Sequence, residues 1–368
     1  MFSKSAVCLM KVIAAGILAV ACGLRASPAL TPFTSQSDQD EKTIVATKSV
    51  PLRALAEKRG FLIGAAFSNL PLMADPFYGH VAAREFNLIT PEYEMNWKFI
   101  HPARNRYNFF VTDKMVAFAE AHKMKVYGHM LLWHMLNPRW LEKGKFTRDE
   151  NIEILRDHIT TVMTHYRGRV GLWVVVNEAI DENKNYGLRE TIWSKGIGDD
   201  YIELAFRMAH DADPGAILIY NDYGADNLGK KSDAIYRMVK SLKEKGVPIH
   251  GVGFQMHLMI NQFNQESLVK NLQRFAELGL NVYITEMDVM LKKGDVTPEM
   301  LQSQAKIYGD ALDACLSQPA CKSFETWGFT DRHSWIPHWF KGYGDALILN
   351  RVYRPKPAYQ AIQKALMK

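Results

Sequence analysis

The sequence predicts an α/β fold and, within that class, a (β/α)8 (TIM) barrel formed by residues 51–368. Three observations support this prediction. The chain has 368 residues, 48% of them hydrophobic, which suits a single barrel of about 250 residues or more. Eight short apolar runs follow Pro51, and eight is the number of strands that such a barrel needs. Stretches with helical spacing separate the runs, and this alternation predicts a parallel sheet.

The predicted strands, in chain order, are residues 61–67, 86–90, 125–130, 171–177, 216–220, 251–255, 281–285 and 324–328. The clearest helix between them begins at a capping box formed by Thr147 and Glu150 and ends before Gly168. Another begins at Thr297, with Pro298 in its first turn. An open doubly wound sheet is the alternative. The nucleotide fingerprints G-x-G-x-x-G and G-x-x-x-x-G-K-S/T, which would favour it, do not occur.

Residues 1–26 have the features of an export signal. Lys4 and Lys11 precede an apolar run at residues 12–20, and small residues follow it. The run is too short to span a bilayer permanently. Two kinds of processing are open: ordinary cleavage, or lipoprotein cleavage that leaves a lipidated Cys22. Both predict an exported protein, periplasmic or extracellular, and the second adds a membrane anchor.

The rest of the composition describes an ordinary exported domain. Residues 27–50 are polar and predict a lead-in or tether. The formal net charge of +6 indicates no nucleic acid or other polyanionic partner, and we expect a monomer. Cys315 and Cys321 have a spacing that suits a disulfide bond in an oxidising compartment.

The candidate site consists of the residues that close the apolar runs, because the C-terminal ends of parallel barrel strands meet at one mouth. These residues combine carboxylates, amides, imidazoles and indoles, a mixture typical of carbohydrate sites. They are Glu92, His129, Trp133, His134, Asn177, Glu178, Asn221, Asp222, Gln255, His257, Glu286, Asp288, Trp327 and Trp335.

Two of these residues, Glu178 and Glu286, each follow a strongly apolar run. A buried carboxylate is costly unless it is paired or functional. Two carboxylates that face each other across a barrel mouth can flank a glycosidic bond. The pair therefore predicts a glycoside hydrolase.

The chain resembles the retaining endo-1,4-beta-xylanases of glycoside hydrolase family 10 over nearly all of residues 55–366. The matching segments occur in family order: Thr90-Pro91-Glu92, Gly128-His129, Trp133-His134, Val175-Val176-Asn177-Glu178, Tyr220-Asn221-Asp222-Tyr223, Gly251-Val252-Gly253 with Gln255 and His257, Ile284-Thr285-Glu286 with Asp288, Trp327-Gly328, Thr330-Asp331, Ser334-Trp335 and Tyr353-Arg354-Pro355-Lys356-Pro357-Ala358-Tyr359.

The resemblance implies a role for each matched residue. Glu178 matches the general acid/base and Glu286 the nucleophile, so Glu178 is expected to hold a proton near neutral pH while Glu286 is ionised. Asn177 matches a contact to the sugar 2-hydroxyl, and His257 a hydrogen-bond partner of the nucleophile. Further substrate-binding matches are Glu92, His129, Trp133, Gln255, Trp327 and Trp335, and supporting residues are Asn221 and Asp288. The family requires no cofactor, and we expect none.

The sequence departs from the family pattern at four positions. Tyr93 and Asn96 replace an asparagine and a lysine, Leu136 replaces a glutamine, and Val174 replaces an aspartate. Three of these changes fall on subsites upstream of the cleaved bond. They favour, as an alternative to xylan cleavage, the same chemistry on a short, decorated or non-xylan beta-glycoside.

Other functions are less consistent with the sequence. A carbohydrate-binding protein without turnover would not need both glutamates. Transglycosylation, in which a sugar replaces water as the acceptor, is not distinguished from hydrolysis. A zinc site at His129 and His134 is not expected, since their spacing falls on a strand and turn and not on a helix.

Overall fold

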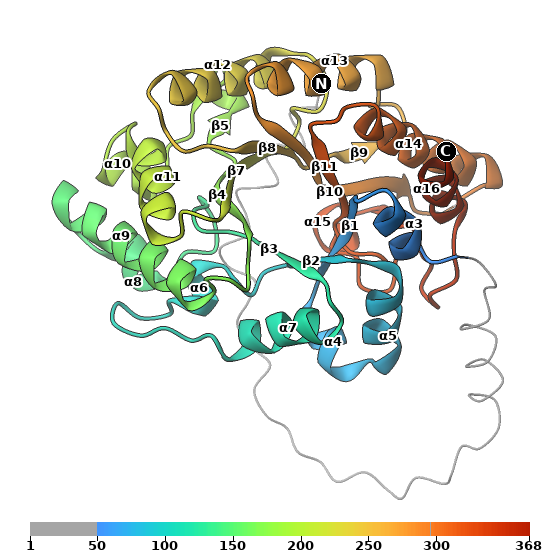
Figure 1. Ribbon diagram of the computed structural model, residues 1–368, viewed down its shortest axis with the longest axis horizontal. Helices are drawn as coiled ribbons and strands as arrows, with labels where there is room; N and C mark the ends of the chain where they lie inside the picture. Colours follow the sequence, from blue (N-terminus) through green and yellow to red (C-terminus); the bar gives the residue numbers. More distant parts are fainter. Residues whose placement is uncertain (1–49, 295) are drawn as a thin grey trace, which may run out of the picture. The chain divides into compact units, whose positions relative to one another are not determined.

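The computed structural model describes residues 50–294 and 296–368. The predicted export signal, Cys22 and nearly all of the polar lead-in lie outside the described residues. Within the described part, eight parallel strands form a sheet in the order β11-β1-β2-β3-β4-β7-β8-β10, and β10 pairs with β11 to close it (Figure 1). The predicted (β/α)8 barrel is confirmed.

The barrel strands are short and buried. They are β1 (Leu62–Phe67), β2 (Leu88–Pro91), β3 (Lys125–Gly128), β4 (Leu172–Asn177), β7 (Ile217–Asp222), β8 (Gly251–Phe254), β10 (Asn281–Lys292) and β11 (Cys321–Thr326). Strands β9 (His257–Met259) and β12 (Tyr343–Gly344) pair with β10, and β5 (Ile180–Asp181) forms a separate two-stranded sheet with β6 (Gly187–Leu188).

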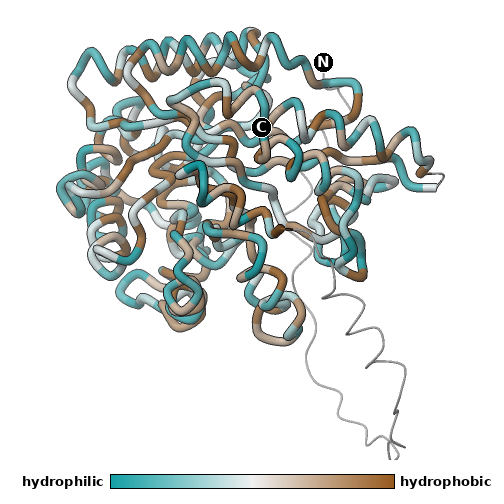
Figure 2. Tube along the Cα trace, turned by 45° about the vertical axis from the view of Figure 1, so that its right-hand side comes forward, coloured by the Kyte–Doolittle hydropathy of each residue, from teal (hydrophilic) through white to brown (hydrophobic). Residues whose placement is uncertain are grey.

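Helices surround the sheet, and their exposed faces are mainly hydrophilic while the strands are hydrophobic (Figure 2). In chain order the helices are α3 (Leu52–Lys58), α4 (Asn69–Ala74), α5 (Pro76–Glu85), α6 (Trp97–Ile100), α7 (Phe110–Ala121), α8 (Arg139–Lys143), α9 (Arg148–His165), η2 (Glu182–Lys184), α10 (Ile192–Gly196), α11 (Tyr201–Ala212), α12 (Lys230–Glu244), α13 (Gln265–Glu277), α14 (Pro298–Leu316), α15 (Ile336–Trp339) and α16 (Pro357–Met367). None of the helices in residues 50–294 and 296–368 is both long and apolar enough to cross a bilayer.

Capping residues define where the two helices that the sequence marks most clearly begin. The hydroxyl of Thr147 accepts from the Glu150 amide, and the Glu150 carboxylate accepts from the Thr147 amide, so the predicted capping box opens α9. The hydroxyl of Thr297 accepts from the Met300 amide at the start of α14. Such caps stabilise a helix by about 1 kcal/mol each.

The barrel core contains Leu88, Tyr127, Val174, Ile219 and Tyr283, all at most 2% exposed. Burying an apolar side chain of this size stabilises the fold by about 1.5–3 kcal/mol. Val174, which replaces the aspartate of the family pattern, therefore has a packing role in this chain.

Six of the barrel strands lie within two residues of their predicted bounds, and β10 and β11 differ by more. β11 begins at Cys321, three residues before the predicted start. The sequence pattern misses this start because the polar residues Ser323 and Glu325 face the barrel interior, where they are fully buried, and interrupt the apolar run. β10 continues past Glu286 to Lys292, because its pairing passes from β8 to β9 beyond Ile284. The pairing of β10 with β11 shifts register between Ile284 and Met287, which places Glu286 at the rim of the barrel.

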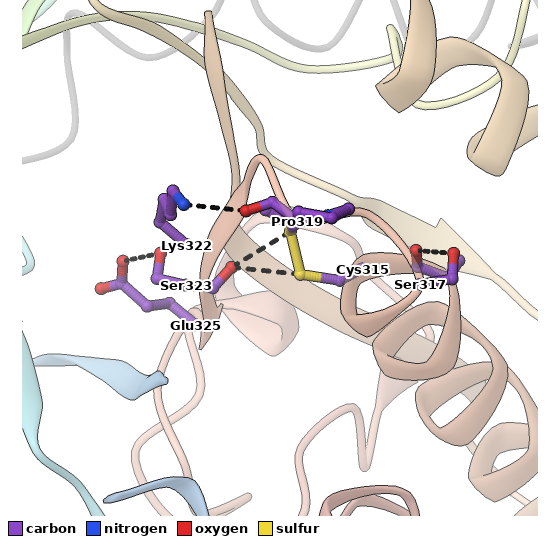
Figure 3. The surroundings of a disulfide bond; sticks show 8 residues. Cys315, Ser317, Pro319, Lys322, Ser323 and Glu325 are labelled. Atoms are coloured by element: carbon purple, nitrogen blue, oxygen red, sulfur yellow. Dashed lines mark hydrogen bonds between the residues drawn. A yellow bond between two sulfur atoms is a disulfide. The ribbon is translucent and has the colours of Figure 1, made fainter. Parts of the chain in front are cut away.

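Cys315 and Cys321 form a disulfide bond between the end of α14 and the start of β11 (Figure 3). The Ser323 carbonyl lies 3.7 Å from the Cys315 sulfur, and the Ser323 hydroxyl donates to Glu325 at 3.3 Å. The bond is at the N-terminal end of β11, the end of the strand opposite to Trp327.

Candidate active site

The structure brings the predicted site residues together at the C-terminal ends of the barrel strands. Asn177 ends β4, Asn221 lies at the end of β7, and Gln255 follows β8. His257 begins β9, directly beside Asp288 of β10. Residues far apart in the sequence thus share one mouth because parallel strands all point the same way.

A continuous chain of hydrogen-bonded amides connects the two glutamates. Asn221 Nδ2 donates to Glu286 Oε1 at 2.6 Å and to Asn177 Oδ1 at 2.9 Å. Gln255 Nε2 donates to the same Asn177 oxygen and to Glu178 Oε1, both at 3.2 Å. Gly253 leaves room for this arrangement, since a Cβ there would lie 2.2 Å from Asn221 Oδ1. The amides therefore set the relative placement of the carboxylates.

Glu286 lies beside a histidine that carries a positive charge. His257 Nε2 lies 3.3 Å from Glu286 Oε2, and its Nδ1 lies 3.0 Å from Asp288 Oδ2. Burial acts to lower the pKa of His257, but the charges of Asp288 and Glu286 and hydrogen bonds to both outweigh it and raise the pKa to about 10. Trp335 Nε1 donates to Asp288 at 2.8 Å and fixes this carboxylate. The charged His257 therefore places a positive charge and a hydrogen-bond donor beside one oxygen of Glu286.

His129 and Trp327 form the other wall beside Glu286. His129 Nε2 lies 4.0 Å from Glu286 Oε1, and its ring meets the Trp327 ring edge-on at 4.9 Å between centroids. Burial lowers the pKa of His129, and the charge of Glu286 only partly opposes this effect. His129 is therefore a neutral wall of the site at pH 7.

Glu178 is positioned by the backbone that follows β4. Its φ is 57°, a left-handed conformation, and its amide donates to the Asn221 carbonyl at 2.9 Å. Trp133 is half-buried beside it: the ring packs on the barrel core and meets His134 edge-on at 5.5 Å. His134 Nδ1 lies 3.8 Å from Glu178 Oε2.

The pKa of Glu178 depends on the charge of His134. Burial alone raises the pKa of Glu178, but a protonated His134 and hydrogen bonds such as that from Gln255 outweigh burial and lower it. This direction is opposite to the expectation of a protonated Glu178. Burial, however, also lowers the pKa of His134, so His134 is mostly neutral near pH 7. With His134 neutral, the strongest influence that lowers the Glu178 pKa is weakened.

Three further carboxyls lie near Glu286, of which Glu92 and Glu325 are buried and Glu94 is half-buried. Burial, the charge of Glu94 and the charge of Glu286 raise the pKa of Glu92 to about 8. Burial also raises the pKa of Glu94, and it raises that of Glu325 to about 8 even though Glu325 accepts from Thr90 Oγ1 at 2.6 Å. At pH 7 Glu92 and Glu325 are therefore protonated and add no negative charge near Glu286.

The remaining departures from the family pattern have local roles. Asn96 is 2% exposed and its Nδ2 donates to the Tyr93 carbonyl at 2.9 Å, so it holds its own loop. Tyr93 is half-buried and forms a side-chain hydrogen bond with Glu92. The Leu136 carbonyl accepts from the Lys98 amide at 2.9 Å.

Sequence reasoning gave too little weight to some of the residues near the glutamates. His134 is among the predicted site residues, but the sequence assigns it no role, whereas the structure places its Nδ1 3.8 Å from Glu178 Oε2. Tyr220 stands in one of the segments that match the family, but no role follows from the sequence for its hydroxyl. Arg189 and Glu325 are not among the predicted site residues, because nothing local marks them as neighbours of the site. Over residues 50–294 and 296–368 there is no group of three His, Cys, Asp or Glu side chains that could hold a metal ion.

A (β/α)8 barrel with two buried glutamates connected through amides at its mouth defines a glycoside hydrolase. The sequence model of Glycosyl hydrolase family 10 matches residues 51–365, and the chain belongs to this family. It is 49% identical to endo-1,4-beta-xylanase B of Thermotoga neapolitana over 87% of this chain and 92% of that protein. It is 38% identical to a beta-1,4-xylanase of Dictyoglomus thermophilum over 86% of this chain and 92% of that protein. The structure of xylanase 10B from Thermotoga petrophila RKU-1 in complex with xylobiose matches with a TM-score of 0.85 and 48% identity, covering 87% of this chain and 98% of that one.

Proposed function

We propose that the protein is a retaining endo-1,4-beta-xylanase that hydrolyses xylan and xylo-oligosaccharides, with Glu286 as the nucleophile and Glu178 as the general acid/base. The observation that carries the proposal is the pair of buried glutamates in unequal surroundings, one beside a charged histidine and one beside a neutral histidine. Family membership and identity to named xylanases of 49% and 38% support the substrate class.

In the first step the Glu286 carboxylate attacks the anomeric carbon while the glycosidic C–O bond breaks. Glu178 donates its proton to the departing oxygen, so the shortened chain leaves as an alcohol. The product is a glycosyl-enzyme ester on Glu286. His257, protonated and hydrogen-bonded to the other oxygen of Glu286, orients the carboxylate for this attack.

In the second step Glu178, now ionised, removes a proton from a water molecule that attacks the same anomeric carbon. The ester bond to Glu286 breaks, the sugar is released with its original configuration, and both carboxyls return to their starting states. The change of Glu178 from acid to base requires a pKa that follows the charge around it. A neutral Glu286 ester, in place of a carboxylate, favours ionisation of Glu178 in this step.

Aromatic and amide side chains around the two glutamates supply the groups that a sugar chain would contact. Trp327, Trp335 and Trp133 present rings around the two glutamates, and Asn177 and Gln255 supply donors and acceptors for hydroxyl groups. The alternative of a short, decorated or non-xylan substrate is not favoured, because proteins with up to 49% identity are named as xylanases.

We further propose that the protein is exported by the N-terminal signal and acts as a monomer, with Cys22 as the site of a lipid anchor if lipoprotein cleavage occurs. The lysine-flanked apolar run at residues 12–20 supports the signal. Mass spectrometry of the mature N-terminus separates the two cleavages, since a diacylglyceryl group on Cys22 adds a characteristic mass. Light scattering measures the oligomeric state.

The test of the proposed activity is hydrolysis of linear xylan, with the product lengths resolved by chromatography and the first-formed anomer by NMR. A ladder of internal cleavage products with β configuration is expected. The variant Glu286→Gln is expected to bind xylo-oligosaccharides and to lose turnover. Inverted products, or turnover that survives in Glu286→Gln, would contradict the proposed roles.

A further inference from the structure

The backbone of residues 178–180 determines where the Glu178 carboxyl points. Glu178 has a φ of 57°, and this left-handed conformation costs a residue other than glycine about 1–2 kcal/mol. A residue in such a conformation persists only where the surrounding contacts impose it. The contacts to this three-residue turn therefore determine the backbone conformation of Glu178.

Arg189 donates a hydrogen bond to each of the three backbone carbonyl groups of the turn. Its Nε donates to the Glu178 carbonyl at 2.9 Å and its Nη2 to the Ile180 carbonyl at 3.1 Å. Its backbone amide donates to the Ala179 carbonyl at 2.7 Å. Arg189 follows β6, whose pairing with β5 returns the chain to this point. Nη2 also donates to the Tyr223 hydroxyl at 3.2 Å, and Nη1 lies 3.8 Å from Asp181, so the guanidinium is held in place.

Tyr220 holds the opposite side of the turn. Its hydroxyl accepts from the Ala179 amide at 3.1 Å and donates to Asp222 Oδ2 at 2.5 Å. Lys231 Nζ lies 2.9 Å from Asp222 Oδ1 and 2.6 Å from Glu182. Tyr220 is fully buried on β7. The hydroxyl is therefore fixed by a charge-assisted hydrogen bond to a carboxylate that is itself paired.

We propose that Arg189 and Tyr220 are positioning residues for the general acid and hold Glu178 in the direction from which it protonates the departing oxygen. We refer to these two residues as the acid clamp. The inference rests on the proposed role of Glu178. The polar groups of both residues contact the backbone of the turn, whereas the Glu178 carboxylate is held by Asn177 and Gln255. Loosening the clamp therefore impairs proton donation and leaves attack by Glu286 intact.

The experiment compares two leaving groups on aryl beta-xylobiosides. A dinitrophenolate leaves without protonation, whereas a phenolate needs the acid. We expect Tyr220→Phe and Arg189→Met to lower kcat/KM for the phenyl substrate by about tenfold or more and to change kcat/KM for the dinitrophenyl substrate by less than about threefold. Tyr220→Phe removes one oxygen and no charge, so it keeps the proposal testable if Arg189→Met does not fold.

The matched controls remove similar groups elsewhere in the barrel. Tyr308→Phe deletes a buried hydroxyl that donates to the Ala346 carbonyl at 2.8 Å, and Arg274→Met deletes a guanidinium that pairs with Asp233 at 2.6 Å. Both are expected to leave the ratio of the two kcat/KM values unchanged. An equal fall on both substrates in the clamp variants, which is what a merely structural role produces, would overturn the inference.

Glu178→Ala separates failure of the inference from failure of the proposed function. If Glu178→Ala loses the phenyl substrate selectively and the clamp variants do not, the clamp is wrong and the acid is right. If Glu178→Ala shows no selectivity, the role of Glu178 itself is wrong. Adding Tyr220→Phe to Glu178→Ala is expected to cause no further loss, because the clamp acts only through Glu178. A further loss in the double variant would also overturn the inference.

Discussion

The two glutamates at the barrel mouth are held in different ways. Glu286 lies within β10, between the residues that pair with β8 and those that pair with β9, and side chains fix it: Asn221 donates to one oxygen and the charged His257 contacts the other. Glu178 lies beyond the end of β4 in a left-handed turn. Contacts to its backbone fix the turn, in addition to the hydrogen bonds from Asn177 and Gln255 to its carboxylate. One carboxyl has a permanent cation beside it, while the other has His134, whose charge changes with pH.

This difference shows how one fold gives two carboxyls different chemistry. A nucleophile must be ionised throughout, and a histidine with a pKa of about 10 provides constant positive charge. An acid/base must gain and lose a proton. The neighbour of Glu178 is His134, whose pKa is lowered by burial, so near neutral pH no fixed positive charge on His134 opposes protonation of Glu178. The predictions below test whether the two sides are as different as the structure indicates.

The largest effect is expected from removing each carboxyl and supplying azide. Glu286→Ala is expected to lower turnover by roughly 10⁵-fold and Glu178→Ala by about 10²–10⁴-fold. Added azide then acts as a nucleophile that does not need the missing carboxyl. In Glu286→Ala it attacks the substrate directly and gives the α-glycosyl azide, whereas in Glu178→Ala it attacks the glycosyl-enzyme and gives the β-glycosyl azide. NMR distinguishes the two products, and the same anomer from both variants would contradict the assignment of roles.

The next largest effect is expected from His257→Gln. This change removes the cation and leaves Glu286 and Asp288 without their shared partner, and breaking such a buried pair typically costs about 3–5 kcal/mol. We expect kcat/KM to fall by about 10²–10³-fold, because Glu286 loses the charged partner that holds one of its oxygens. The control is His165→Gln, which breaks the exposed pair with Asp113. A fall of equal size in His165→Gln would show that the loss of activity is not specific to the pair of His257 and Glu286.

A smaller effect is expected on the pH dependence of stability. Glu92 and Glu325 have pKa values of about 8 in the folded protein, against about 4.3 for an unfolded glutamate. Between these values the folded state binds more protons, so the free energy of unfolding falls as pH rises, by up to about 1.4 kcal/mol per pH unit for each group. His257 adds to the fall above about pH 6.5, because stability from its charge is lost as pH approaches its folded-state pKa.

Urea unfolding between pH 5 and 9 measures this slope. Glu325→Gln keeps a neutral side chain of the same size, so the slope is expected to become shallower than in the wild type. Glu57→Gln, which alters an exposed pair with Arg53 on α3, is expected to leave the slope unchanged. Parallel slopes for wild type and Glu325→Gln would contradict burial of a protonated Glu325.

The smallest effect is expected from replacing both Cys315 and Cys321 by serine. The bond closes a short segment between residues six apart, for which the loss of chain entropy predicts a stabilisation of about 2 kcal/mol. The free energy of unfolding is expected to fall by about that amount, with kcat/KM unchanged, because the bond lies at the opposite end of β11 from the site. A loss of activity at a temperature where the variant is folded would show that this end of the barrel influences the mouth.

Local patterns made much of the fold and site predictable. Apolar runs located the barrel strands, and the caps at Thr147 and Thr297 located two helix starts within a residue, because both depend on neighbouring residues. The polar residues that close the runs placed Glu178 and Glu286 at one mouth, since parallel strands end on the same side. The start of β11 was missed, because Ser323 and Glu325 face the barrel interior and interrupt an apolar pattern.

The sequence by itself determined the barrel, the family and the two candidate carboxyls, since these follow from periodicity, strand ends and ordered motifs. Only the tertiary structure decided what surrounds each carboxyl. Arg189 reaches the turn after Glu178 through the β5–β6 pairing, and His257 meets Asp288 through the β9–β10 pairing. The charge and direction of a buried carboxyl depend on such contacts between strands, and no local pattern in the sequence encodes them.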